Sequence, residues 1–482
     1  MLEYIISWKT TQEKSEKIKN KFQKMKKTET IAAISTAMNS SGIGIVRISG
    51  DEAFDIIKKI FKPVNSKDIS AAASHTVHYG NIVDGDKIVD EVLVLIMRSP
   101  HTYTREDTVE IDCHGGIYVL NRVLETVLKN GARPAQPGEF TQRAFVNGRI
   151  DLSQAEAVID VINAQNDYAL KSAVGQLKGS VSEKIKSLRA VILEQVAYIE
   201  AALDDPEHIE MNGYGKELLP VLDECISETD KLIESAEDGR IIKEGIRTVI
   251  LGKPNAGKSS FLNALIGQER AIVTDIAGTT RDALEESVRI KDITLNIVDT
   301  AGIRNTEDII EKIGVDKARE YAKTADLIVF VADTSVSLSE EDFEIINLMK
   351  GKKAIVLLNK SDLESVWDAY ELRRYLSCPF VEISAKNGKG ISDFEETVRH
   401  MFYNNEINFN DQIYITNARQ KNALTAANES LKAAVDTINS GLSEDFYTID
   451  MMDAYTSLGE VIGEAIEDDL ADEIFSKFCM GK

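Results

Sequence analysis

The chain of 482 residues lacks the patterns that mark several large classes of protein. Its four cysteines are far apart and form no CxxC pair, which argues against a disulfide framework and a structural zinc site. No apolar run reaches the roughly 18 residues that a membrane-spanning helix needs. This cysteine usage fits a reducing cytosol, so we predict a cytoplasmic protein without a membrane segment.

Positive charge is also scarce, since 56 Lys and Arg stand against 79 Asp and Glu and the formal net charge is -23. Binding to phosphates depends on Lys and Arg, so an acidic chain is a poor stand-alone ligand for RNA. If the protein acts on nucleic acid, a basic partner or a local basic patch must supply most of the attraction.

The first 24 residues do not have the order of a signal peptide. A short apolar patch comes first and a lysine-rich stretch follows, whereas a signal peptide starts with its positive end. We interpret residues 1–24 as a leader that is disordered or not native, with Met25 as the alternative start. A helix on a membrane surface is the other interpretation.

The apolar pattern changes along the chain and predicts a multidomain protein with α+β and α/β parts. Residues 25–145 combine short β-branched runs with a helical segment, as in an α+β domain. Residues 245–403 alternate short apolar runs with helices, which is typical of a parallel sheet. Long helical segments, 146–244 and 404–482, flank that part. We predict one helical domain that is split by an inserted α/β domain.

A phosphate-binding loop is predicted where the inserted domain begins. Residues 252–259 read GKPNAGKS, which matches GxxxxGK[ST] between a predicted strand and a predicted helix. The glycines let backbone N–H groups turn toward phosphates. Lys258 can reach the β and γ oxygens, and Ser259 can ligate Mg²⁺.

Further motifs follow in the order that a GTP-binding domain needs. GTTRD offers Thr280 as a second Mg²⁺ ligand. DTAG offers Asp299 to Mg²⁺ through a water, and the Gly302 amide to the γ-phosphate. NKSD offers Asp362, whose carboxylate accepts the two N–H donors that guanine has and adenine lacks. SAK follows the next strand and supports the base. Together these motifs predict a Ras-like P-loop GTPase domain. The expected GTP-binding residues in and beside these motifs are Asn255, Ala256, Gly257, Lys258, Ser259, Ser260, Gly278, Thr279, Thr280, Asp299, Thr300, Ala301, Gly302, Asn359, Lys360, Asp362, Ser384, Ala385 and Lys386.

The glutamine that orients the attacking water in many such switches is missing. Its place after DTAG is taken by Ile303, which has no polar side-chain group. Asn255 could instead bind a monovalent cation beside the β/γ bridge, where other GTPases place an arginine finger. Other groups near DTAG could act: the acids Glu307, Asp308 and Glu311 could orient a water, and Arg281 and Arg304 could supply charge. Spacing alone does not choose between them.

Longer runs of the sequence resemble one protein family. Within the inserted domain these are GKPNAGKSSFLNALIGQERAIVTDIAGTTRD, DTAGIR and EKIG. Outside it they are GIGIVRISG, PGEFTQRAFVNGRIDLSQAEAV and the terminal DEIFSKFCMGK. These runs are similar to the MnmE (TrmE) family of tRNA-modification GTPases, and the resemblance covers nearly all of residues 28–482.

The resemblance implies how hydrolysis proceeds without the glutamine. Asn255 would coordinate K⁺ together with backbone oxygens of Thr274, Ile276 and Thr279, and Glu311 would orient the water. The loop that supplies these oxygens would add Thr274, Asp275, Ile276 and Ala277 to the GTP-binding residues. It would become ordered when two GTPase domains of a homodimer meet face to face. K⁺ and the partner surface would then do what a GTPase-activating protein does elsewhere.

The resemblance also implies that the N-terminal domain dimerises and binds 5-formyl- or 5,10-methylene-tetrahydrofolate. The matching positions are Arg47, Glu110, Arg149 and Lys482. A carboxylate suits the amidine-like edge of a pterin, and cations suit the glutamate tail. Two departures from the family pattern occur here. TAMNSSG replaces a Pro-Gly turn at residues 36–42, and the family often has lysine at Arg149.

The family's reaction adds a carboxymethylaminomethyl or aminomethyl group to C5 of the wobble uridine, U34, of certain tRNAs. Folate supplies the one-carbon unit, and the partner MnmG (GidA) brings FAD, NADH and most of the basic tRNA surface. One alternative is a ribosome-assembly GTPase switch without modification chemistry. Another is a one-carbon transferase with a regulatory GTPase and a substrate other than tRNA.

Two cysteines invite a chemical role. Cys479, in the terminal motif, is either a nucleophile or a small packed residue, and no base is identifiable beside it. Cys113 and His114 are adjacent, but we interpret them as structural.

Overall fold

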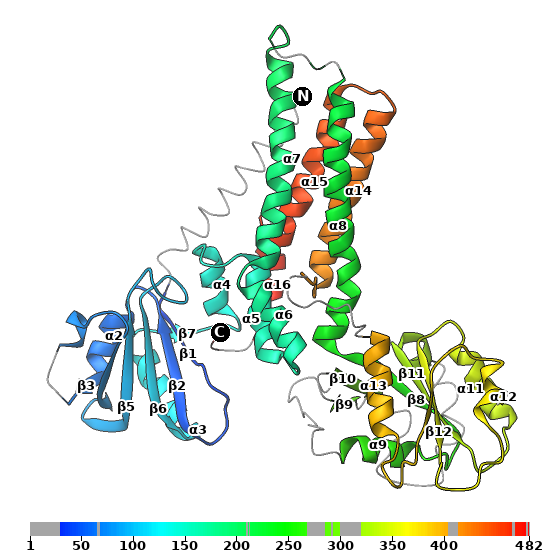
Figure 1. The fold of residues 1–482 in the computed structure, drawn as a ribbon. Helices are drawn as coiled ribbons and strands as arrows, with labels where there is room; N and C mark the ends of the chain where they lie inside the picture. Colours follow the sequence, from blue (N-terminus) through cyan, green and yellow to red (C-terminus); the bar gives the residue numbers. More distant parts are fainter. Residues whose placement is uncertain are drawn as a thin grey trace. The chain divides into compact units, whose positions relative to one another are not determined.

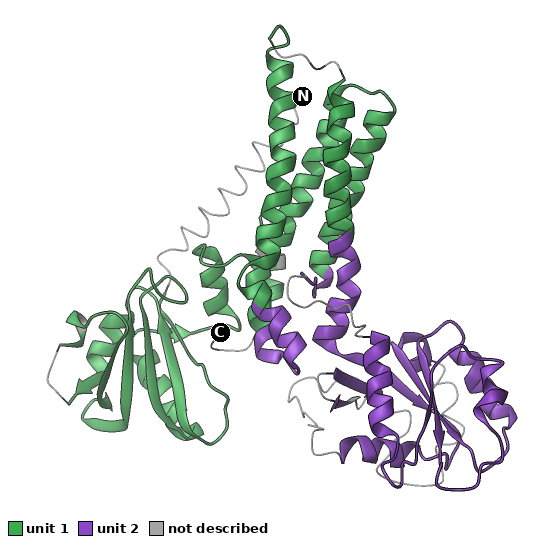
Figure 2. Ribbon diagram, in the orientation of Figure 1, with its two compact units in different colours: residues 1–159, 175–230, 419–482 green, residues 160–174, 231–418 purple. Residues whose placement is uncertain are grey.

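The computed structural model, drawn in Figure 1, describes residues 29–64, 68–208, 211, 213–267, 285–290, 293–298, 320–402, 413–464, 468–478 and 481. Figure 2 shows that the chain forms two compact units. Unit 1 combines residues 1–159, 175–230 and 419–482, and unit 2 combines residues 160–174 and 231–418. The chain therefore leaves unit 1 and returns to it, as an insertion requires. None of the helices within the described ranges is both long and apolar enough for a membrane span.

Unit 1 contains a seven-stranded sheet in the order β3-β4-β5-β6-β2-β1-β7. Its elements are β1 (Ile31–Ile34), β2 (Ser41–Ser49), α2 (Ala53–Ile60), β3 (Phe61–Pro63), η1 (Ile69–Ala71), β4 (Thr76–Asp84), β5 (Lys87–Met97), β6 (Thr108–Gly115), α3 (Ile117–Lys129) and β7 (Arg133–Pro134). Alternate residues such as Val46, Val94 and Ile111 are buried beneath α2 and α3. The opposite side chains of β2 and β6, Arg47 and Glu110 among them, lie on the other face. The α+β pattern predicted for this region is confirmed, with β1, β2, β5, β6 and α3 among its elements.

The rest of unit 1 is helical, and α7, α8, α14 and α15 run side by side in Figure 1. The helices, some of which extend into unit 2, are α4 (Glu139–Val146), α5 (Leu152–Asn163), α6 (Asp167–Leu177), α7 (Ser180–Asp204), α8 (Tyr214–Glu244), α14 (Ala418–Asn439), α15 (Glu444–Ile462) and α16 (Asp468–Ser476). Arg419 of α14 forms two 2.9 Å contacts with the buried carboxylate of Glu156 on α5. Removing one partner of a buried pair costs about 3–5 kcal/mol. Helices from before and after the insertion are thus joined, as predicted.

Unit 2 contains a six-stranded sheet in the order β13-β12-β11-β8-β10-β9. Its strands are β8 (Ile246–Leu251), β9 (Glu285–Ile290), β10 (Ile293–Val298), β11 (Leu327–Asp333), β12 (Ala354–Asn359) and β13 (Phe380–Glu382). Its helices after β8 are α9 (Lys258–Ile266), α11 (Glu340–Met349), α12 (Ala369–Arg373) and α13 (Ile391–Phe402). All neighbouring pairs are parallel except β9 with β10, which is antiparallel.

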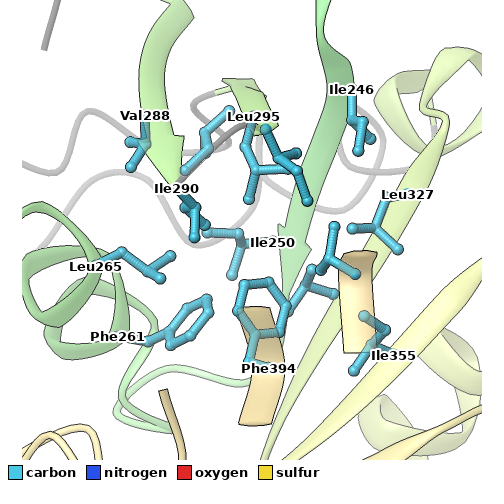
Figure 3. Packing of buried hydrophobic residues seen from close by; sticks show 14 of the residues in the cluster. Ile246, Ile250, Phe261, Leu265, Val288, Ile290, Leu295, Leu327, Ile355 and Phe394 are labelled. Carbon is cyan, nitrogen blue, oxygen red and sulfur yellow. The ribbon is translucent and has the colours of Figure 1, made fainter. Parts of the chain in front are cut away.

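The sheet of unit 2 is covered on both faces, as its almost fully apolar strands require. On one face, shown in Figure 3, Phe261 of α9 and Phe394 of α13 meet edge to face at 5.1 Å among strand residues such as Ile250. On the other face, Ile346 of α11 packs against Phe330. The carboxyl ends of β8, β11 and β12 therefore meet at one edge, where such sheets bind ligands.

Candidate functional sites

The predicted phosphate-binding loop joins β8 to α9. Gly252 and Gly257 have φ angles of +154° and +100°. A Cβ atom on Gly257 would lie 2.1 Å from Nδ2 of Asn359, and one on Gly252 would lie 2.5 Å from the oxygen of Val331. Only glycine fits both positions. Asn255 lies between them with a φ angle of +60°, and its side chain is exposed.

Lys258 is the first residue of α9, and its ammonium lies inside the loop. Nζ donates to the backbone oxygens of Gly252 at 2.6 Å and Lys253 at 2.8 Å. Burial lowers the pKa of Lys258, and within the described ranges it forms no ion pair. A buried ammonium without a counter-charge suits the oxygens of a phosphate. Ser259 and Ser260 follow and are exposed in the first turn of α9.

The NKSD and SAK motifs meet the phosphate-binding loop through one buried side chain. Asn359, at the end of β12, donates from Nδ2 to the oxygen of Ala256 at 2.7 Å and accepts from the amide of Ala385 at 3.0 Å. Asp362 accepts a 2.7 Å hydrogen bond from the hydroxyl of Ser384. That hydrogen bond holds the pKa of Asp362 below its ordinary value, so the carboxylate is ionised at neutral pH. The three predicted loops therefore lie together in space.

Two acidic residues that sequence reasoning missed contact these loops. Oδ2 of Asp333 lies 2.5 Å from Nζ of Lys360, and Oδ2 of Asp342 lies 2.6 Å from Nζ of Lys253. Both acids belong to the segment from the end of β11 to the first turn of α11. The sequence held one sign of this role for Asp333: the apolar run of β11 ends in an acid, at the edge of the sheet where the loops meet.

Several predicted site residues lie outside the part of the chain that the structure describes. From the GTP, Mg²⁺ and K⁺ sites these are Thr274, Asp275, Ile276, Ala277, Gly278, Thr279, Thr280, Asp299, Thr300, Ala301, Gly302 and Glu311. Lys482, Cys479, Ile303, Arg281, Arg304, Glu307 and Asp308 also lie outside it. Ser259 and Asn255 remain as the described members of the Mg²⁺ and K⁺ sets.

The described residues of the predicted folate set, Arg47, Glu110 and Arg149, come together in unit 1. Nε of Arg47 lies 2.7 Å from Oε1 of Glu110, its direct partner across β2 and β6. Arg47 also donates to the oxygen of Gly481 at 3.2 Å, and the hydroxyl of Ser35 donates to the same oxygen at 3.1 Å. Gly481 immediately precedes Lys482 in the sequence. The C-terminal motif is thus attached to the Arg47–Glu110 pair.

Two aromatic rings that sequence reasoning missed complete this group. The Arg47 guanidinium lies 5.6 Å from the ring centre of Phe140 and 5.9 Å from that of Tyr103. The exposed Arg149 lies 4.8 Å from the same Tyr103 ring. No local motif marks Tyr103, because its role depends on residues that are distant in sequence. We call Arg47, Glu110, Tyr103, Phe140 and Arg149 the Arg47 cluster.

Cys113 and His114 have separate surroundings. The Cys113 thiol is buried and donates to the oxygen of Gly44 at 3.4 Å, and burial raises its pKa to about 11. Nδ1 of His114 faces Oδ1 of Asp90 at 2.7 Å. In the described part of the chain, no three His, Cys, Asp or Glu residues are grouped to hold a metal ion. These contacts agree with the structural interpretation of the Cys113–His114 pair.

A solved structure resembles part of the chain. The G domain of the T. maritima FeoB iron transporter is 30% identical and covers 32% of this chain and 96% of its own. Its TM-score is 0.24, which is too low to indicate a shared overall fold.

Whole-chain comparisons are more informative. Residues 30–149 match the model of the GTP-binding protein TrmE N-terminus, and residues 152–479 match that of the MnmE helical domain. The tRNA modification GTPase MnmE of Lachnoclostridium phytofermentans is 56% identical over 457 residues, which cover 95% of this chain and 100% of that protein. The protein of the same name from Bacillus subtilis is 45% identical over 458 residues, with 94% and 100% covered. The chain therefore belongs to the MnmE family of tRNA modification GTPases.

Proposed function

We propose that this chain is a K⁺-dependent GTPase, activated by dimerisation, that modifies tRNA together with an MnmG (GidA) flavoprotein in the cytoplasm. The pair adds a carboxymethylaminomethyl or aminomethyl group to C5 of the wobble uridine, U34, with a tetrahydrofolate one-carbon unit. The observation that carries this proposal is that one chain combines joined nucleotide loops with the Arg47 cluster. The acidic charge of the chain supports a division of labour in which the partner holds most of the tRNA.

In this proposal each region has its own task. Residues 25–145 dimerise and bind folate, and residues 245–403 hydrolyse GTP. Residues 146–244 and 404–482 form the helical domain that connects them and carries the FCMGK motif.

The nucleotide loops suit GTP. Lys258 neutralises phosphate charge, because within the described ranges its partly buried ammonium has backbone oxygens beside it and no carboxylate. Asp362 accepts the two N–H donors of guanine and thereby selects GTP over ATP. Ser259 and Thr280 would hold Mg²⁺, which supplies charge neutralisation at the β and γ oxygens when bound.

The cation proposal rests on Asn255. Its side chain is exposed within the phosphate-binding loop and forms no hydrogen bond within the described ranges. An oxygen ligand suits a hard cation. Asn255 would hold K⁺ with backbone oxygens of Thr274, Ile276 and Thr279, and Glu311 would orient the water.

Hydrolysis rates in KCl and NaCl test this part. Asn255→Ala should remove K⁺ stimulation while GDP affinity stays within about twofold, because phosphate contacts persist. Asn263→Ala, an exposed asparagine on α9, is the matched control and should behave as the unmutated protein. Equal rates of the unmutated protein in both salts would overturn the cation proposal.

Glu311→Ala should lower the GTP hydrolysis rate far more than the affinity for GTP. An unchanged hydrolysis rate would return the role of orienting the water to Glu307 or Asp308.

The Arg47 cluster suits a folate. Glu110 offers a carboxylate to the amidine-like edge of a pterin, and the half-buried ring of Tyr103 offers flat apolar surface beside it. Phe140 is fully buried and supports Arg47 from beneath. Arg149 is an exposed cation for the glutamate tail, and Lys482 would be another. Folate supplies the one-carbon unit when bound.

Mass spectrometry of tRNA nucleosides tests the whole proposal. A deletion strain should lose the U34 modification, and a plasmid copy of the gene should restore it. Unchanged U34 modification would overturn the proposal. A ribosome-assembly defect with intact U34 would favour the switch alternative.

A further inference from the structure

Asp333 is a buried carboxylate that the proposed mechanism does not use. It ends β11 and is 8% exposed. Its Oδ2 lies 2.5 Å from Nζ of Lys360, and its Oδ1 accepts hydrogen bonds from the amide of Ser335 at 2.9 Å and from the Ser335 hydroxyl at 2.6 Å. Both oxygens of Asp333 are therefore engaged, one of them by the lysine of NKSD.

The backbone of Lys360 explains why this contact matters. Its φ angle is +65°, in the left-handed region. That conformation costs a residue with a Cβ atom roughly 1–2 kcal/mol, and it persists only where the surroundings fix it. Asp362 lies two positions further along the chain. The twist at Lys360 therefore sets the direction in which the chain reaches Asp362.

The neighbours of Lys360 are already fixed. On one side, Asn359 is held by the oxygen of Ala256 and the amide of Ala385. On the other side, the amide of Ser361 donates to the oxygen of Ile383 at 3.1 Å. The Lys360 side chain is the part left to fix, and its ion pair with Asp333 fixes it.

Asp333 is itself held firmly against this loop. β11 and β12 are parallel, with Asp333 and Asn359 in register. The next residue, Thr334, donates to the oxygen of Asn359 from its amide at 3.2 Å and from its hydroxyl at 3.0 Å. Burial by itself raises the pKa of Asp333, but hydrogen bonds from Lys360 and Ser335 outweigh it and hold the pKa below its ordinary value. Asp333 is thus an ionised, immobile anchor at neutral pH.

We infer that Asp333 is a positioning residue for guanine recognition, and that it acts through Lys360. The pair holds Lys360 in its left-handed conformation and so aligns Asp362 with the N–H donors of guanine before the nucleotide arrives. This inference rests on the proposed GTP site. Without the pair, Lys360 relaxes and Asp362 is aligned only part of the time, which weakens binding.

Nucleotide binding and hydrolysis by the full-length chain test the inference. Asp333→Ala should raise the Kd of a fluorescent GDP about tenfold and raise KM similarly, while kcat at saturating GTP stays within about twofold. Lys360→Ala should weaken binding at least as much. Because Asp333 acts through Lys360, the double variant should bind as weakly as Lys360→Ala alone. Asp333→Asn keeps an oxygen acceptor and should recover part of the loss, to a Kd about threefold above that of the unmutated protein.

The other end of β11 offers a matched control. Asp326 directly precedes β11, and its carboxylate lies 2.6 Å from Arg240 and accepts from the amide of Arg247 at 2.9 Å. Asp326→Asn should lower the thermal midpoint and leave the Kd for GDP unchanged. A structural role for Asp333 would instead make the Asp333 and Asp326 variants alike.

Several results would overturn the inference. These are an unchanged Kd in Asp333→Ala, an unchanged Kd in Lys360→Ala, or losses that multiply in the double variant. If Asp333→Ala does not fold, Asp333→Asn decides, and an unchanged Kd overturns the inference. GDP binding by the unmutated protein separates failure of this inference from failure of the proposed function. If the unmutated protein does not bind GDP, the proposed GTP site itself is rejected.

Discussion

The nucleotide loops and the Arg47 cluster are built in opposite ways. Each nucleotide loop is a short continuous run of sequence at the carboxyl end of a strand, and the sheet of unit 2 brings the runs together. The Arg47 cluster is attached to a tail residue 434 positions away from Arg47. A local loop keeps its chemistry when distant parts change, whereas an assembled cluster depends on every segment. The comparison predicts that the two sites fail separately and for different reasons.

The largest effect is expected at the phosphate-binding loop. Lys258→Ala removes the buried ammonium from the phosphate position, so kcat/KM for GTP should fall on the order of 10²–10³-fold. Folate binding should not change, because in the part of the chain that the structure describes the Lys258 ammonium is hydrogen-bonded within its own loop. Lys350→Ala, at the exposed C-cap of α11, is the control and should leave hydrolysis intact. A GTPase rate in Lys258→Ala that equals the control would remove Lys258 from the site.

The next effect is expected in the Arg47 cluster. Glu110→Ala removes a charged acceptor and leaves Arg47 without its 2.7 Å partner. Loss of a charge-assisted hydrogen bond costs about 1.5–3 kcal/mol, so affinity for 5-formyl-tetrahydrofolate should fall roughly 10–100-fold. Calorimetric titration measures it. Glu125→Ala, whose carboxylate pairs with Lys129 on the exposed side of α3, is the control. Equal folate affinity in the Glu110 and Glu125 variants would show that Glu110 does not belong to the folate site.

A smaller change tests the long-range assembly directly. Gly481 has a φ angle of +88°, and a Cβ atom there would lie 2.3 Å from the oxygen of Ile34. Gly481→Ala should displace the tail and lower folate affinity roughly 3–10-fold, because the chain must shift to avoid the clash. Gly441→Ala shares a positive φ angle of +68° but meets nothing within 4 Å. Gly441→Ala should therefore lose some stability and keep its folate affinity. Identical folate affinities in the two variants would show that the position of Gly481 does not matter for folate binding.

The smallest effect is expected in how the free energy of unfolding depends on acidic pH, at Glu139 next to the Arg47 cluster. Burial by itself raises the pKa of Glu139, but hydrogen bonds from Arg133 and the amide of Gln136 and the charge of Arg143 hold it below its ordinary value of 4.5. A depressed pKa contributes stability above the unfolded value, and that stability is lost as pH falls through the folded pKa. Glu139→Gln should flatten this acid loss by at most about 1.4 kcal/mol per pH unit. Denaturant unfolding at several acidic pH values measures the slope, and parallel slopes would contradict the assignment.

The nucleotide loops could be predicted from the sequence, whereas the assembly of the Arg47 cluster could not. The phosphate-binding loop was predictable because Gly252 and Gly257 stand at fixed spacing from Lys258, between a strand and a helix. Strands β2 and β6 were predictable from their own apolar runs. The hydrogen bond from Arg47 to Gly481 was not, because no local pattern records a contact between the two ends of a chain.

The residues that sequence reasoning missed share a physical cause. Asp333 is an ordinary acid at the end of a strand until the register of β11 and β12 brings it beside Lys360. Tyr103 is an ordinary loop residue until Arg47 and Arg149 approach its ring. Both depend on pairing between segments, which a single sequence does not state. The family resemblance supplied Arg47, Glu110 and Arg149. The structure places Arg47 and Arg149 beside Tyr103 and pairs Glu110 with Arg47.

One pair of titrations tests most directly the central claim that two separately built sites lie on one chain. Fluorescent GDP and 5-formyl-tetrahydrofolate are each titrated into the unmutated protein, Lys258→Ala and Glu110→Ala. The account predicts a crossed result: Lys258→Ala loses GDP affinity and keeps folate affinity, and Glu110→Ala does the reverse. Loss of both ligands by either variant, with its thermal midpoint unchanged, would contradict it.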